Sequence, residues 1–130
     1  MQAESLLAEG ADANAVDKNG RRAVHFAAFK GELAVLQLLG SKGADLDAED
    51  ADVASAVQYA ALANREQCLM FLADRGCWLD SFDRHDNTAL HLAARHGASD
   101  TAQRLLRLGA KRHLANQRKL TPLGLSLIHI

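Results

Sequence analysis

The sequence predicts an all-α solenoid of stacked helix–turn–helix units joined by hairpin-like fingers. Two observations carry this prediction. First, unrelated residue types recur every 33 positions, which is the signature of a repeat architecture. Second, each period contains two short apolar patterns with helical spacing, separated by a glycine or an asparagine. The recurring positions are Gly10, Gly43, Gly76 and Gly109; Leu6, Leu39, Leu72 and Leu105; the pairs Ala27–Ala28, Ala60–Ala61 and Ala93–Ala94; and Asp17, Asp50, Asp83 and Asn116.

The period at 83–116 shows how each element is expected to form. The hydroxyl of Thr88 can cap a first helix. The apolar face of that helix consists of Ala89, Leu90, Ala93 and Ala94. Gly97 is expected to end it, because a left-handed residue at a helix end is most often glycine. Residues 98–108 are expected to form a second helix, and Gly109 ends that one.

The alanine pairs have a physical reason within this scheme. Small side chains allow the first helices of neighbouring units to approach closely, while the leucine-rich second helices fill the layer behind them. Neither layer can be buried within a single unit. The sequence therefore predicts that stability comes from stacking.

These residues resemble the ankyrin repeat. Thr88–Ala94 followed by Gly97 matches the first-helix signature of that family, and Ala23–Ala28 followed by Gly31 matches it as well. Gly43–Asp45 matches its exit turn. The resemblance covers nearly the whole chain. It implies a partial unit at 1–16, full units at 17–49, 50–82 and 83–115, and a truncated unit at 116–124.

The last six residues suggest a different origin. Leu125–Ile130 is encoded by the string CTG TCT CTT ATA CAC ATC, which resembles the end of a transposon-derived sequencing adapter. We expect the natural sequence to stop near Gly124 and residues 125–130 to be adapter read-through.

The middle unit departs from the pattern. Val53 stands at the finger turn where the first finger has Gly20 and the third has Asp86. Because β-branched residues disfavour the positive φ that such a turn needs, the sequence predicts a distorted or looser middle finger. Asn64 replaces a helix-terminating glycine, and asparagine tolerates that conformation.

Composition and motifs favour a binding protein. The net charge of -1 gives no reason to expect nucleic acid, and no apolar run approaches the roughly 20 residues of a membrane span. Two cysteines without metal or disulfide spacing indicate reduced thiols, and therefore a cytoplasmic or nuclear protein. No catalytic, cofactor or metal motif is present, so we predict no enzymatic activity, no cofactor and no metal. The family resemblance implies that His25 and His91 are structural.

The resemblance also implies a binding surface on the concave side, formed by finger tips and the exposed face of each first helix. We predict a protein or peptide partner there, a monomeric chain, and Trp78 packed across its finger. The alternative is a regulatory or targeting segment of an enzyme, channel or ligase whose active domain lies elsewhere. The predicted contact residues are Lys18, Arg21, Phe29, Lys30, Asp52, Leu62, Phe82, Arg84, His85, Asn87, Arg95 and His96.

Overall fold

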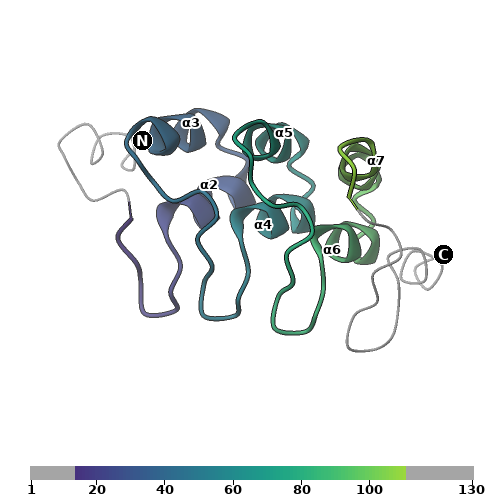
Figure 1. The fold of residues 1–130 in the computed structure, drawn as a ribbon, viewed down its shortest axis with the longest axis horizontal. Helices are drawn as coiled ribbons and strands as arrows, with labels where there is room; N and C mark the ends of the chain where they lie inside the picture. The colour runs from purple at the N-terminus through teal and green to yellow at the C-terminus, as the bar shows by residue number, and fades with distance from the viewer. Residues whose placement is uncertain (1–13, 111–130) are drawn as a thin grey trace.

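The computed structural model describes residues 14–110, and within them it contains six α-helices in two layers (Figure 1). The inner layer consists of α2 (Ala23–Lys30), α4 (Ala56–Leu62) and α6 (Ala89–Arg95). The outer layer consists of α3 (Leu33–Ser41), α5 (Glu66–Asp74) and α7 (Ser99–Arg107). The predicted all-α solenoid is confirmed for this part of the chain. The predictions for residues 1–13 and 111–130, including the truncated unit and the adapter segment, lie outside the described residues.

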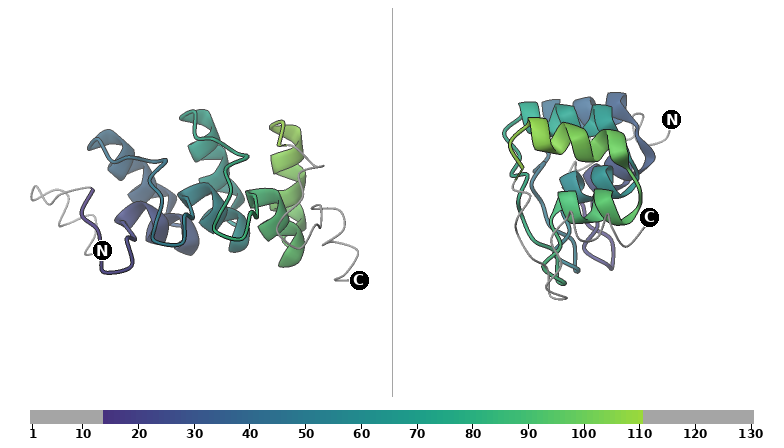
Figure 2. Two further views of the ribbon diagram at one scale, coloured as in Figure 1. Left: turned by 60° about the horizontal axis from the view of Figure 1, so that its bottom comes forward. Right: turned by 90° about the vertical axis from the view of Figure 1, so that its right-hand side faces the viewer.

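The fingers give the molecule an L-shaped cross-section. Each finger leaves an outer helix, turns, and returns to the next inner helix (Figure 1). Seen along the stack, the fingers project from the side of the inner layer that faces away from the outer layer (Figure 2). The angle between the fingers and the inner helices is the concave side of the solenoid.

The inner helices pack against one another through the alanine pairs, as predicted. Ala28, Ala60, Ala61 and Ala93 are each 0% exposed. The space between the two layers is filled by leucines that are also fully buried. These leucines are Leu36, Leu39, Leu69, Leu72 and Leu105. The core is therefore one continuous layer of apolar contacts that runs through the stack.

The helix ends follow the predicted chemistry. The Thr88 hydroxyl accepts a hydrogen bond from the His91 N–H at 3.4 Å, which caps α6. Gly31 and Gly97 follow or flank the ends of α2 and α6 in the left-handed region, with φ of 76° and 68°. Asn64 takes the same conformation in the middle unit, with φ of 58°. Asparagine thus replaces glycine at this position without loss of the turn.

The recurring aspartates hold the fingers in shape. The Asp50 Oδ1 atom accepts hydrogen bonds from the N–H groups of Asp52 and Ala54, both at 2.9 Å. Asp17 and Asp83 accept the equivalent pairs in the neighbouring fingers. These bonds close each finger tip, which explains why aspartate recurs with the 33-residue period.

The expected distortion of the middle finger is not found. The Val53 N–H donates to the Asp50 carbonyl at 3.0 Å, just as the Gly20 N–H donates to the Asp17 carbonyl at 3.0 Å. Val53 reaches this geometry with a φ of 62°, in the left-handed region. The bonds that Asp50 accepts fix the turn, and Val53 bears the backbone strain instead.

We predict that Val53→Gly stabilises the protein by about 1 kcal/mol. Removing the strain of a β-branched residue in the left-handed region adds about 1–2 kcal/mol to the free energy of unfolding. The greater conformational freedom of glycine in the unfolded chain offsets about half of this gain. Urea unfolding provides the measurement. Val16→Gly is the matched control, because Val16 is 57% exposed and has no positive φ. If Val53→Gly destabilises the protein as the control is expected to, the strain argument is wrong.

Candidate functional site: the concave face

Buried polar side chains of the inner helices fix the fingers to the helices. The His25 Nδ1 atom accepts from the Arg22 N–H at 2.9 Å, so the ring proton lies on Nε2 and is donated to the Ala48 carbonyl at 2.9 Å. His25 is 1% exposed and His91 is 0% exposed. Both therefore have the structural role that the sequence predicted.

Gln58 takes the place of this histidine in the middle helix. Its Oε1 atom accepts from the Ser55 N–H at 3.1 Å, and its amide nitrogen donates to the Ser81 carbonyl at 2.8 Å. The same nitrogen lies 3.3 Å from the Asn87 carbonyl. A side-chain amide offers an acceptor and a donor, as neutral histidine does, so the connection to the next finger is preserved.

Two rows of side chains cross the inner helices on the concave side. The first row is Phe26, Tyr59 and Leu92, and the second row is Phe29, Leu62 and Arg95. Successive members of each row are 33 residues apart, so each row runs from α2 over α4 to α6. Phe26 and Phe29 are 42% and 46% exposed, and Tyr59, Leu62 and Leu92 are partly exposed.

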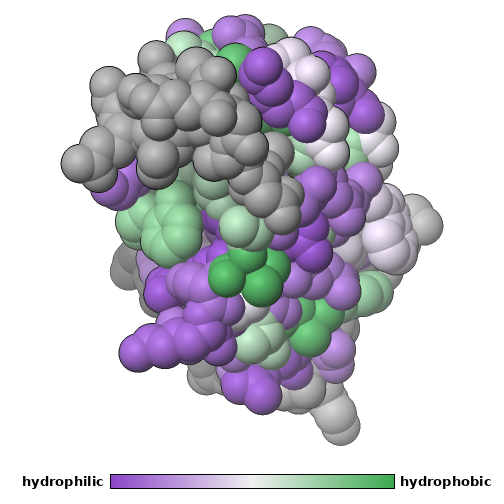
Figure 3. Space-filling model, turned by 90° about the vertical axis from the view of Figure 1, so that its left-hand side faces the viewer, coloured by the Kyte–Doolittle hydropathy of each residue, from purple (hydrophilic) through white to green (hydrophobic). Residues whose placement is uncertain are grey.

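Aromatic contacts connect the first two helices within these rows. The rings of Phe29 and Tyr59 meet edge to face, with centroids 6.2 Å apart. The guanidinium of Arg21 lies over the Phe26 ring at 5.0 Å. At the N-terminal end of the stack, apolar surface lies amid hydrophilic surface (Figure 3).

Tyr59 also couples α4 to the middle finger. Its hydroxyl donates to the Oδ2 atom of Asp50, whose Oδ1 atom already holds the finger turn. Asp50 is only 8% exposed, so the phenol supplies a donor to a carboxylate that is largely shielded from water. Burial raises the pKa of Tyr59 well above its usual value of 10.0, and the hydrogen bond and charge of Asp50 raise it further.

A hollow of about 370 Å³ lies between the middle and third fingers. Its floor is formed by Tyr59, Leu62 and Leu92, and its walls by finger residues of both charge signs. The Arg84 guanidinium pairs with the Asp52 carboxylate at 2.9 Å, and the Arg84 N–H donates to the Asp52 carbonyl at 3.1 Å. The hollow thus has an apolar floor and charged walls.

Models of two ankyrin families match the chain. One, described as ankyrin repeats in three copies, matches residues 34–116, which is more than half of the sequence. The other, described as ankyrin repeats in many copies, matches residues 1–40. The chain belongs to the ankyrin-repeat family. No curated protein matches the chain. Ankyrin repeats are general protein–protein interaction modules and are typically not catalytic.

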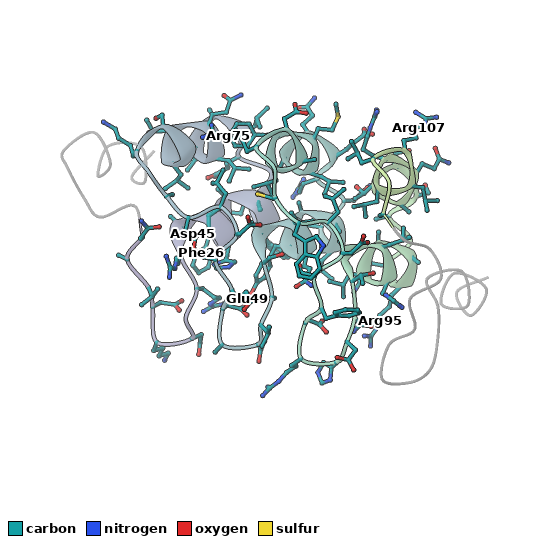
Figure 4. All side chains as sticks on the ribbon, viewed as in Figure 1. Phe26, Asp45, Glu49, Arg75, Arg95 and Arg107 are labelled. Carbon is teal, nitrogen blue, oxygen red and sulfur yellow. The ribbon has the colours of Figure 1, made fainter. Side chains whose placement is uncertain are left out.

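Most of the residues predicted for the ankyrin binding surface are accessible. The exposed ones are Lys18, Phe29, Lys30, Asp52, Phe82, Arg84, His85, Arg95 and His96. Arg21 and Leu62 are partly exposed. Arg95 lies at the finger side of α6, whereas Arg107 lies on α7 in the outer layer (Figure 4).

Two side chains differ from the expectation. Asn87 is 5% exposed, so its placement on the exposed surface was wrong; its backbone N–H and carbonyl are hydrogen-bonded to the side chains of Asp83 and Gln58. Trp78 was expected to pack across its finger, but it is 64% exposed. Phe82 is 38% exposed, as expected, although it does not line the hollow of the concave side.

The row of Phe26, Tyr59 and Leu92 was not among the predicted contact residues. Phe26 and Leu92 lie within the segments that match the first-helix signature of the family. The internal period could have revealed the row, because each member precedes a predicted contact residue by three positions and one helical turn. Such spacing places both rows on one face.

The described residues show no metal site and no reactive thiol. No group of three or more histidine, cysteine or acidic side chains in residues 14–110 could hold a metal ion. Cys68 and Cys77 are buried and unbridged, and burial raises the pKa of both thiols, that of Cys77 to about 12. No helix among these residues is long and apolar enough to cross a membrane.

The Tyr59–Asp50 bond predicts a pH dependence of stability. Because folding raises the pKa of Tyr59, this contribution is fully present below pH 10.0 and is lost as the pH rises towards the folded-state pKa. Tyr59 is the single tyrosine, so ultraviolet difference absorbance reports its ionisation alone. We expect a midpoint well above pH 10.0 in the folded protein and about 10 in denaturant.

A folded-state midpoint near the usual value would contradict this assignment. Tyr59→Phe provides a second measurement, because it leaves the Asp50 carboxylate without one donor. We expect it to lower the free energy of unfolding by about 1–3 kcal/mol at neutral pH.

Proposed function

We propose that this ankyrin segment binds a protein or peptide partner on its concave face. The observation that carries the proposal is the pair of rows across α2, α4 and α6, which leaves large apolar side chains partly open to solvent on three consecutive helices. The stacked alanines and leucines are fully buried and cannot contact a partner. Aromatic side chains in such a position are typical of interaction hot spots.

The charges around the rows have both signs. Lys18, Lys30, Arg84 and Arg95 are exposed at the finger tips or at the ends of the inner helices. Asp52, which pairs with Arg84, and Asp86 are exposed on the fingers as well, and Asp50 and Asp83 line the hollow. A partner with apolar groups flanked by charges of both signs would complement this surface. We further propose that the chain binds as a monomer.

The test begins with a peptide selected from a random display library on the immobilised protein. We expect Phe29→Ala and Arg95→Ala to weaken binding of that peptide by about tenfold or more, because well-buried anchors contribute roughly 1–2 kcal/mol or more. Isothermal titration calorimetry measures the affinities. Arg107→Ala is the control, because Arg107 is exposed on α7 in the outer layer.

The outcomes separate the two faces. If Arg107→Ala alone weakens binding while both concave variants bind normally, the partner contacts the outer layer and the proposal fails. If Phe26→Ala also weakens binding, the row of Phe26, Tyr59 and Leu92 takes part in recognition.

A further inference from the structure

Two neighbouring exit segments, residues 44–49 and 77–82, connect an outer helix to the following finger. Exposure alternates along the first segment; in the second, Leu79, Asp80 and Ser81 are all partly exposed and Leu79 packs against the core. In the first segment the buried residues are Leu46 and Ala48. The exposed ones are Asp45, Asp47 and Glu49. In the second, Cys77 is buried, Asp80 is partly exposed, and Trp78 and Phe82 are exposed. One side of each segment therefore faces the core and the other faces solvent.

The two segments lie side by side where the second one begins. The Trp78 N–H donates to the Asp47 carboxylate at 3.3 Å, and the Cys77 thiol lies 3.8 Å from the Leu46 carbonyl. These contacts place Trp78 beside the Asp47 carboxylate. We define the acidic–aromatic face as Asp45, Asp47, Glu49, Trp78, Asp80 and Phe82.

The fold itself does not require the indole of Trp78. Trp78 stands 33 positions after Asp45, at the same place in the exit turn. The two turns are alike: the Ala44 N–H donates to the Leu39 carbonyl at 3.0 Å, and the Cys77 N–H to the Leu72 carbonyl at 3.1 Å. The preceding glycines, Gly43 and Gly76, both have a φ of 83°. An aspartate therefore builds the same turn, and the tryptophan is left 64% exposed.

The charge of the first exit segment is negative. It carries the carboxylates of Asp45, Asp47 and Glu49, whereas the whole chain has a net charge of -1. The ion pairs of the described residues at Asp17, Asp52 and Glu66 do not involve these three side chains, while Asp80 has an interaction partner of its own. The guanidinium of Arg75 lies over the Phe71 ring at 5.7 Å. Asp45 and Glu49 mark the two ends of the first segment (Figure 4).

We propose that the acidic–aromatic face binds a basic peptide segment of a partner protein. An arginine or lysine of that segment lies on the Trp78 indole, because tryptophan gives the strongest cation–π contact. Further cationic groups pair with the carboxylates of the first segment. The same charges repel nucleic acid and acidic peptides. This surface is separate from the concave face, so the proposal does not rest on the concave binding site.

The chain offers a direct probe of this binding. Trp78 is its single tryptophan, so intrinsic fluorescence reports this surface alone. The probe is a peptide of alternating arginine and serine without aromatic residues. We expect a saturable change in Trp78 emission and an affinity that falls as salt is added, because exposed charges are screened. A matched peptide of glutamate and serine is expected to leave the emission unchanged.

Charge-matched variants test where the peptide binds. We expect Asp45→Asn/Glu49→Gln to lower the affinity about five- to tenfold, since each exposed ion pair contributes up to about 1 kcal/mol. Asparagine at position 45 keeps the oxygen that accepts from the Asp47 N–H. The control is Asp74→Asn/Asp100→Asn, two exposed residues of α5 and α7 that change the net charge equally.

The outcomes are decisive in either direction. A loss confined to the Asp45/Glu49 pair, with the control within about twofold of the unmodified chain, supports the proposal. Equal weakening by both pairs would show a general charge effect, and the proposal would fail. It would also fail if no saturable change in emission occurred, or if Phe29→Ala removed binding of the basic peptide.

Discussion

The close approach of the inner helices through their alanine pairs is the contact on which the other features of the molecule depend. Ala60 and Ala61 of α4 are fully buried between Ala28 of α2 and Ala93 of α6. This spacing brings each finger within hydrogen-bonding distance of the next, as the bond of 3.0 Å from the Ala51 N–H to the Asn19 carbonyl shows. It also lets a single side chain, such as Gln58, reach the backbone of the following finger. A larger residue at these positions would separate the helices and the fingers together.

The same packing determines which residues are left for recognition. The stacked alanines and leucines are buried between the helices. The exposed surface is therefore formed by residues at positions that do not take part in stacking. On the concave side these are Phe26 and Phe29 with their counterparts, and on the exit segments they are Trp78 and Phe82. Equivalent positions in successive units can be compared directly. Asp45 and Glu49 stand in one unit where Trp78 and Phe82 stand in the next. The concave side carries charges of both signs and the first exit segment carries carboxylates alone, which would allow two chemically different segments to bind at once.

The sequence predicted the architecture well because its period reports stacking directly. Positions such as Ala93, Asn64 and His25 have the burial, backbone conformation and hydrogen bonds that their types suggest. The errors arose where tertiary contacts override a local preference. Val53 adopts a positive φ because the Asp50 carboxylate and the Asp50 carbonyl fix the turn around it. The burial of Asn87 and the exposure of Trp78 depend on neighbouring units, which no single segment of sequence describes.

The free energy of unfolding of the Ala93→Leu variant tests the close stacking of the inner helices most directly. Ala93 is 0% exposed in the inner layer, so the added side-chain atoms must push α4 and α6 apart. We expect a loss of about 1–3 kcal/mol in urea unfolding, whereas Ala34→Leu, at an exposed position of α3, should change stability by less than about 0.5 kcal/mol. If Ala93→Leu is as stable as the unmodified chain, the inner helices are not held at the distance that alanine permits, and the stacking described above is contradicted.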